Sequence, residues 1–127
     1  MIHPILNRDE TVLLADTDEQ RLRLIAESLS AAGVRAVPAL GGGELLEAIR
    51  GQLFSRAVVA ADMTAAGQPA LWRLASLPSM RRLVAVGPLD CETDARRNGA
   101  DVFLCHPPRL DDLLRALRSA WNVVERV

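Results

Sequence analysis

The sequence predicts a three-layer α/β domain in which helices cover both faces of a five-stranded parallel sheet. Short uncharged apolar runs alternate with segments whose apolar residues recur at helical spacing, and the connections between them are short. The run from Ala57 to Ala61 is apolar throughout, with Arg56 before it and Asp62 after it, as expected of a strand buried on both faces. This alternation is typical of doubly wound parallel sheets.

Five apolar runs are predicted to be the strands. They are Thr11 to Ala15, Val34 to Ala39, Ala57 to Ala61, Leu83 to Val86 and Val102 to Cys105. Asp16 follows the first run and Asp62 follows the third. Because the chemistry of open parallel sheets is found at the carboxyl ends of the strands, we expect these two carboxylates at one edge of the sheet.

The helices are predicted between these runs. The first begins after Thr17 or Asp18, either of which can accept a first-turn N–H, with Gln20 placed three residues after Thr17 as in a capping box. Gly33 ends it. The others open at Gly41 to Gly43, run from about Pro69 to Leu77 and from Cys91 to Asn98, and follow Pro108. The last carries the cleanest amphipathic stripe, which includes Trp121.

The composition is that of one globular domain. The chain has 127 residues, half of them hydrophobic, and a net charge of −1. This balance gives no overall attraction to nucleic acid or to an anionic membrane. The scarcity of aromatic residues argues against a base-stacking surface.

The extent and the compartment follow from the same sequence. We expect a core from about residue 11 to 121, with residues 1–10 as a loose lead-in. The apolar runs are shorter than the roughly 20 residues of a membrane span, and Met1 to Arg8 does not have the pattern of a secretory signal. Cys91 and Cys105 are expected to be free thiols in a reducing cytoplasm. The chain could be a free-standing adaptor, or an output domain could follow Val127.

Several landmarks together resemble the receiver domain of bacterial two-component response regulators, from about Thr11 to Trp121. They are the acidic cluster after the first strand, Asp62 after the third, Gly99-Ala100-Asp101 before the fifth and Pro107 directly after it. The resemblance implies a flavodoxin-like (βα)5 fold and a role in phosphorelay signal transduction. It also implies that Asp62 matches the phosphoacceptor and that Asp16 is the first of the paired acids that hold Mg²⁺.

The sequence departs from the receiver pattern at most of the phosphate site. Thr17 stands where the second acid is expected, and a hydroxyl is a poor ligand for a hard dication. Asp18 could substitute, although a helix cap is the simpler role. Gly87 replaces the hydroxyl residue after the fourth strand, and His106 replaces the lysine. Phe103 stands at the aromatic switch position without a hydroxyl.

These departures predict a degenerate receiver (pseudo-receiver) that is no enzyme and needs no cofactor. One alternative is a working phosphoacceptor domain, in which Asp16 and Asp62 hold Mg²⁺ weakly and Asp62 is phosphorylated. Another is a haloacid-dehalogenase-like phosphatase with Asp16 as nucleophile and Asp18 as acid/base, although Gln20 does not fit that motif. A nucleotide- or flavin-binding module lacks a phosphate loop after the first strand, and Gly41 to Gly43 lacks its spacing.

The predicted partner is another protein or a second copy of the chain, as in a dimer. Trp72 lies off the inward stripe of its helix, and tryptophan and arginine are enriched at the centres of interfaces. The candidate interaction residues are Trp72, Arg96, Arg97, Arg115 and Arg118.

Overall fold

The structure is a computed structural model that describes residues 11–125, with side chains described as far as Arg118. Five parallel strands form one sheet in the order β2-β1-β3-β6-β7. In that order they are β2 (Arg35–Leu40), β1 (Thr11–Asp16), β3 (Arg56–Ala60), β6 (Arg82–Gly87) and β7 (Val102–Cys105). The predicted doubly wound parallel sheet is confirmed.

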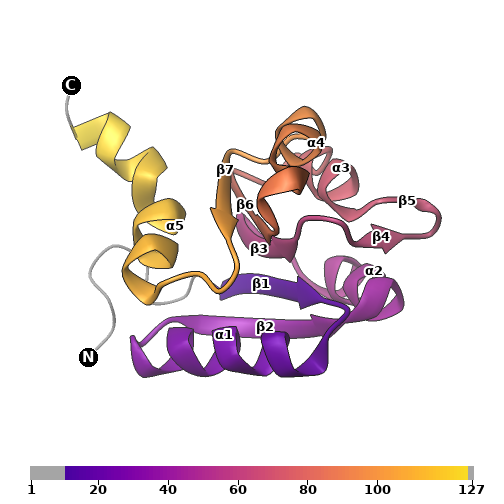
Figure 1. Ribbon diagram of the computed structural model, residues 1–127, viewed down its shortest axis with the longest axis horizontal. Helices are drawn as coiled ribbons and strands as arrows, with labels where there is room; N and C mark the ends of the chain where they lie inside the picture. Colours follow the sequence, from indigo (N-terminus) through magenta and orange to yellow (C-terminus); the bar gives the residue numbers. More distant parts are fainter. Residues whose placement is uncertain (1–10, 126–127) are drawn as a thin grey trace.

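Helices cover both faces of this sheet (Figure 1). One face is covered by α1 (Glu19–Ala31) and α5 (Leu110–Glu125). The other is covered by α2 (Gly41–Gly51), α3 (Ala70–Ala75) and α4 (Glu92–Arg97), and the 3-10 turn η1 (Leu89–Cys91) leads into α4. Among the described residues, no helix is both long enough and apolar enough to cross a membrane.

Alternate residues of each central strand supply the two halves of the core. In β1, Leu13 and Ala15 pack with α2 and α3, whereas Val12 and Leu14 pack with α1 and α5. All four are at most 1% exposed. This double burial explains why the strand is apolar at every position rather than at every second one.

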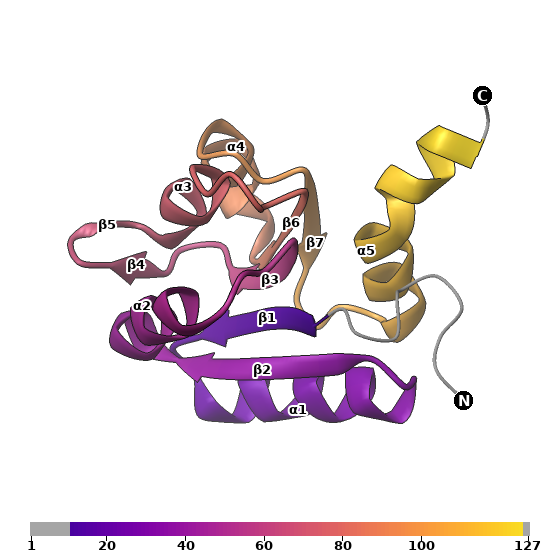
Figure 2. The same cartoon turned by 180° about the vertical axis from the view of Figure 1, so that it is seen from behind.

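A hairpin that the sequence did not predict follows β3. Its strands are β4 (Thr64–Ala65) and β5 (Gln68–Pro69), which pair antiparallel around Ala66 and Gly67. Both turn residues have positive φ, 53° and 78°, as a type I′ turn requires. The hairpin extends beyond the edge of the sheet (Figure 2). Alanine is an uncommon residue at a positive-φ turn position, so the sequence gives little sign of this turn.

The first turn of α2 packs closely against this hairpin. The three glycines predicted to open the helix do form its first residues. A Cβ on Gly42 would lie 2.6 Å from the carbonyl oxygen of Thr64 and 2.9 Å from Cα of Ala65, whereas a Cβ on Gly43 would meet nothing within 4 Å. On the other side, Arg73 Nε donates a hydrogen bond to the Ala65 carbonyl at 3.0 Å. The hairpin is therefore held between α2 and α3.

Two arginines at the amino ends of β3 and β6 donate hydrogen bonds to backbone carbonyls of α5. Arg56 and Arg82 are register neighbours on β3 and β6. Arg56 Nη1 donates to the carbonyl of Leu117, and Arg82 Nε donates to the carbonyl of Ala116 at 2.8 Å. Burial lowers the pKa of Arg82, the charge of Asp101 opposes this shift, and Arg56 adds to it. Arg56, expected just before the strand, is its first residue and is buried, which the sequence did not predict.

The contact between α2 and the hairpin gives the first prediction. Gly42→Ala should lower the free energy of unfolding by about 1–3 kcal/mol, because the added methyl group meets rigid backbone. The matched change Gly43→Ala, one residue on, should leave stability unchanged or raise it by up to about 1 kcal/mol, since it adds helix propensity in open space. Urea denaturation of both variants measures the difference, and equal effects at the two positions would contradict the close approach.

Candidate functional site

Four strands of the sheet end side by side at one edge, where the site residues predicted from the sequence lie. Asp16 is the last residue of β1, and Asp62 comes two residues after β3. Gly87 is the last residue of β6, and His106 directly follows β7. These strands are consecutive neighbours in the sheet. The parallel topology therefore gathers the four residues at one edge, as expected for a site of this fold.

The carboxylate of Asp16 is buried and paired with a guanidinium. Asp16 is 3% exposed. Arg21 donates from Nε to Oδ2 at 3.1 Å and from Nη2 to Oδ1 at 3.0 Å, and the backbone N–H of Asp18 donates to Oδ1 at 2.9 Å. Burial raises the pKa of Asp16, but the Arg21 hydrogen bonds and charge and the backbone N–H groups lower it by more, so the net shift is downward. The chain itself thus supplies the cation that keeps Asp16 ionised.

Arg21 is not among the site residues predicted from the sequence. It lies in the first turn of α1 and reaches back to the end of β1. Its hydrogen bond to Asp16 raises the pKa of Arg21, burial opposes the rise, and the charges of Asp16, Asp18 and Asp62 add to it. A cation is unfavourable near the positive end of a helix. An arginine there, five residues after a buried aspartate, is the signal that could have indicated the pair.

Thr17 and Asp18 connect Asp16 to the helix. Asp18 is the N-cap of α1, and its Oδ1 accepts the backbone N–H of Arg21 at 3.0 Å. The capping box anchored on Thr17 was therefore wrong, because the cap lies one residue later. Thr17 is exposed at the edge. The side chain of Asp18 is thus engaged in capping, the simpler of the two roles considered for it.

Asp62 is exposed and borders a hollow of about 260 Å³ on the side of η1 and α4. Asp90 and Asp94 line the same hollow, together with Cys91. Burial raises the pKa of the Cys91 thiol, and the nearby carboxylates of Asp90, Asp62 and Asp94 raise it further. None of these effects favours the thiolate, which is the reactive form of a cysteine.

The residues at this edge do not fit the Mg²⁺ that the receiver resemblance implies. Both oxygens of Asp16 already accept hydrogen bonds from Arg21. The neighbouring position offers the neutral and exposed Thr17. Within the described residues, no three His, Cys, Asp or Glu side chains are grouped so that they could hold a metal ion. A hard dication needs several anionic oxygens that are free to coordinate it.

Gly87 is buried, and its neighbour leaves no room for a side chain. A Cβ on Gly87 would lie 2.9 Å from Cβ of Ala61. Both residues are fixed by backbone hydrogen bonds, from Ala61 N to the Val86 carbonyl at 2.8 Å and from His106 N to the Gly87 carbonyl at 3.2 Å. The methyl group of Ala61 therefore fills the space into which a hydroxyl side chain at the end of β6 would project.

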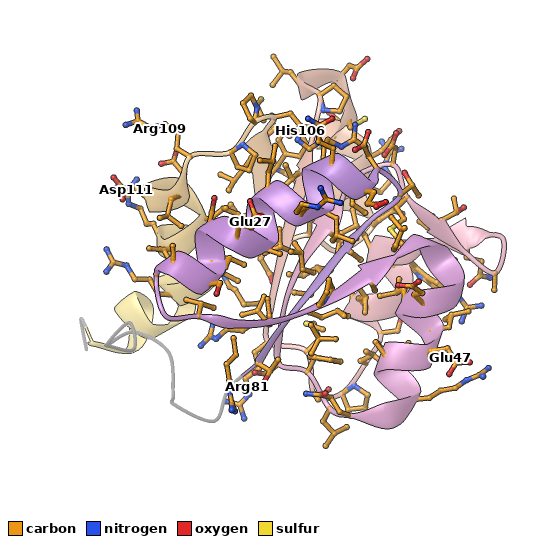
Figure 3. The ribbon with its side chains drawn as sticks, turned by 90° about the horizontal axis from the view of Figure 1, so that it is seen from below. Glu27, Glu47, Arg81, His106, Arg109 and Asp111 are labelled. Atoms are coloured by element: carbon orange, nitrogen blue, oxygen red, sulfur yellow. The ribbon has the colours of Figure 1, made fainter. Side chains whose placement is uncertain are left out.

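His106 lies half-buried at the carboxyl edge and precedes Pro107 through a cis peptide bond. Figure 3 shows His106 and Arg81 at opposite ends of the sheet, as expected for a residue after β7 and one before β6. His106 thus lies at the carboxyl end of β7, and its assignment to the phosphate site stays a prediction.

Phe103 points into the core. Its side chain is 9% exposed and belongs to the cluster beneath α2, α3 and α4. Its register partner on β6 is Ala85, which leaves space for the ring.

The candidate interaction residues lie on three helices. Trp72 on α3 is 48% exposed, as predicted. Each exposed arginine has an intrahelical partner: Arg96 with Glu92 at 3.0 Å, Arg97 with Asp94 at 3.4 Å, and Arg115 with Asp112 at 3.3 Å. Arg118 is half-buried, and its Nε has no hydrogen-bond partner within the described part of the chain. The side chain of Trp121 lies outside the described residues.

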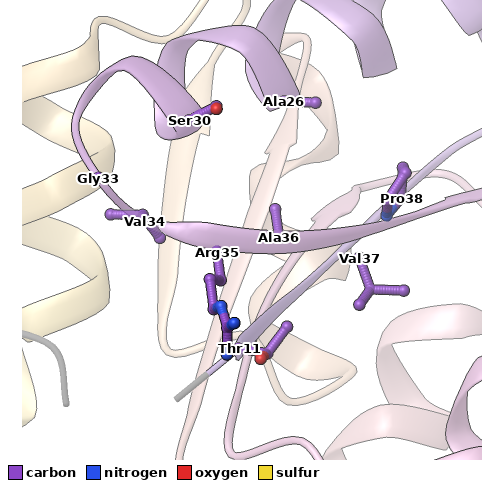
Figure 4. A pocket seen from close by; sticks show the side chains of 9 residues that line it. All are labelled: Thr11, Ala26, Ser30, Gly33, Val34, Arg35, Ala36, Val37 and Pro38. Carbon is purple, nitrogen blue, oxygen red and sulfur yellow. The ribbon is translucent and has the colours of Figure 1, made fainter. Parts of the chain in front are cut away.

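A larger hollow of about 720 Å³ lies away from the candidate site, along edge strand β2 and the end of α1 (Figure 4). Most of its lining is small or apolar, with Thr11, Ser30 and Arg35 as the polar exceptions. Pro38 also lines it and cannot donate a backbone hydrogen bond, which protects this edge from pairing with another strand. None of the acidic residues of the candidate site borders this hollow.

Comparison with known proteins supports the fold. No family model matches the sequence, and no curated protein matches it significantly. The receiver domain of Francisella response regulator 1452 is similar, with a TM-score of 0.71 and 19% identity, covering 91% of this chain and 99% of that one. The chemotaxis response regulator CheY4 of Vibrio cholerae has a TM-score of 0.71 and 17% identity, covering 87% and 97% of the two chains.

Full-length FixJ from B. japonicum is similar over only part of its length. The TM-score is 0.74 and the identity 22%, covering 92% of this chain and 60% of the FixJ chain. The chain thus has the flavodoxin-like fold of response-regulator receiver domains, which confirms the predicted fold class.

The contact between Gly87 and Ala61 gives the second prediction. Gly87→Ser should lower the free energy of unfolding by about 1–3 kcal/mol, because its Cβ collides with the Ala61 methyl group. In the Ala61→Gly background the same change should cost less, with a coupling free energy of about 1 kcal/mol or more. Chemical denaturation of the two single variants and the double variant measures this coupling. Additive effects would mean that Ala61 does not fill the space.

Proposed function

We propose that this chain is a signal-transduction regulatory domain of the receiver type that acts through protein–protein contacts, without phosphorylation and without enzymatic activity. The observation that supports this best is the packing at the end of β6. Gly87 offers no hydroxyl, and the Ala61 methyl group occupies the space that such a side chain would need. At this one position, packing against Ala61 therefore takes the place of the hydroxyl side chain.

The other site positions support the same proposal. Asp62 remains exposed at the phosphoacceptor position. However, Thr17 does not provide the second metal-binding acid, and His106 does not provide a permanent cation. Phosphoryl transfer depends on positioning and on neutralising the charge of the phosphoryl oxygens. An isolated Asp62 supplies neither.

The alternatives are less well supported. A working phosphoacceptor domain would need Mg²⁺ at Asp16 and Asp62, where the donor set does not fit. A haloacid-dehalogenase-like phosphatase would use Asp18 as its acid/base, but this side chain caps α1, and Asp16 is engaged by Arg21. Neither carboxylate is free for that chemistry.

Output through surface contacts is supported by the exposed residues of α3 and α5. Trp72 presents a large apolar surface to solvent. Arg115 borders a small hollow between α5 and strands β6 and β7, together with Asp112, Val102 and Leu104. Mixed apolar and arginine surfaces are typical of interface centres. We propose a partner protein or a second copy of the chain as the ligand, and no nucleic acid.

The third prediction concerns phosphorylation. Incubation with acetyl phosphate and Mg²⁺ should leave the intact mass unchanged, because loss of each charge-stabilising group typically slows a reaction by about 10²–10³-fold. Asp62→Asn is the control, since it removes the acceptor. The proposal fails if wild type gains one phosphoryl group stoichiometrically and Asp62→Asn does not.

The fourth prediction concerns association. We expect sedimentation velocity to show concentration-dependent association that Trp72→Ala and Arg115→Glu each weaken by about tenfold or more, the size of an interface hot spot. Leu24→Ala and Arg23→Glu are matched controls, because Leu24 is exposed and Arg23 is ion-paired on α1. Strictly monomeric behaviour of every variant, or equal effects of the control changes, would contradict these surfaces.

A further inference from the structure

Asp16 combines deep burial with a full set of hydrogen bonds. The side chain is 4% exposed, and a buried carboxylate needs a cation close by. In this chain both oxygens face the fork of the Arg21 guanidinium, at 3.0 and 3.1 Å, and Oδ1 also accepts the backbone N–H of Asp18. This bidentate arrangement is the strongest geometry available to an arginine and a carboxylate.

Arg21 cannot be replaced by a dication without losing these contacts. A metal on Asp16 would use the same oxygen lone pairs, and its positive charge would lie beside the guanidinium. Arg21 is itself held in place, because its backbone N–H is bound by the Asp18 cap and its Nη1 lies 3.9 Å from Asp18 Oδ2. The position next to Asp16 offers Thr17, which adds no negative charge.

We propose that the Arg21 guanidinium is the resident cation of this site and excludes divalent cations from Asp16. The charge of Asp16 is then neutralised by the chain itself, whatever the metal concentration around the protein. This inference deepens the proposed function and rests on it only in treating Asp16 and Asp62 as the receiver-type site. Arg21 acts here as a positioning and charge-compensating residue, not as a catalytic one.

The test measures metal binding to the whole chain in the absence of any phosphodonor. Free Mn²⁺ is counted by electron paramagnetic resonance, and Mg²⁺ binding is followed by thermal melting. Wild type should bind neither ion at low millimolar concentration. Arg21→Gln combined with Thr17→Asp should bind at least about tenfold more tightly than wild type, because it exposes Asp16 and adds a carboxylate.

A matched control separates the role of Arg21 from a general loss of positive charge. Arg23 lies on the same helix and pairs with the exposed Glu19 at 3.5 Å. Arg23→Gln combined with Thr17→Asp removes the same charge, but it should bind clearly less metal than the Arg21 double variant. The inference is overturned if the two double variants bind equally, or if wild type already binds as tightly as either.

A second measurement on wild type decides the question even where the variants do not fold. The Nε–H resonance of Arg21, assigned by through-bond correlations in the wild-type chain, should be protected from exchange with water and should not move when Mg²⁺ is added. A Mg²⁺-dependent shift or loss of this resonance would mean that the metal displaces Arg21.

These outcomes are separate from those of the phosphorylation test. Phosphorylation of Asp62 without any binding of metal to the wild-type chain would overturn the proposed function and leave the role of Arg21 intact. Metal binding by wild type without phosphorylation would overturn the role of Arg21 alone.

Discussion

A buried carboxylate requires a nearby cation, and the pairing of Asp16 with Arg21 meets this requirement. An unpaired charge in a buried position costs several kcal/mol. The Asp16–Arg21 pair therefore constrains the segments that carry these two residues. Because Arg21 lies in the first turn of α1, the contact joins the end of β1 to the start of the helix, and Asp18 caps the helix in the same turn. The end of β1 and the start of α1 are therefore organised around an internal ion pair.

The sheet could be predicted from the sequence because its determinants are local. An apolar run such as Val58 and its neighbours is buried on both faces whatever lies elsewhere in the chain. The burial of Arg56 could not be predicted, for the opposite reason. Its hydrogen-bond partner is the carbonyl of Leu117, 61 residues away, so nothing nearby in the sequence shows that the cation is buried and satisfied. The hairpin was missed because Ala66 adopts a φ of 53° that alanine seldom takes.

Part of the candidate site could be predicted from the sequence. There is a physical reason why the rest could not. Parallel strands bring residues that end them to one edge, which is why Asp16, Asp62 and Gly87 could be placed together before the structure was known. The contacts that these residues make with their neighbours could not be predicted in this way. Whether Gly87 borders an open space or a packed contact depends on Ala61, which directly follows the adjacent strand β3. Whether Asp16 is free depends on the direction of the Arg21 side chain, which sequence spacing alone does not fix.

Phe103 and Gly87 also limit how such a domain could change state. In the receiver resemblance, a hydroxyl after the fourth strand and an aromatic hydroxyl on the fifth take part in the switch. Here the first is replaced by packing against Ala61 and the second by a buried phenyl ring, whose burial stabilises the inward position by roughly 1.5–3 kcal/mol. A ligand can shift an equilibrium only by its differential affinity for two states. On the proposed function, regulation therefore depends on which partner is present at the surface, since the end of β6 offers no hydroxyl through which a second state could be favoured.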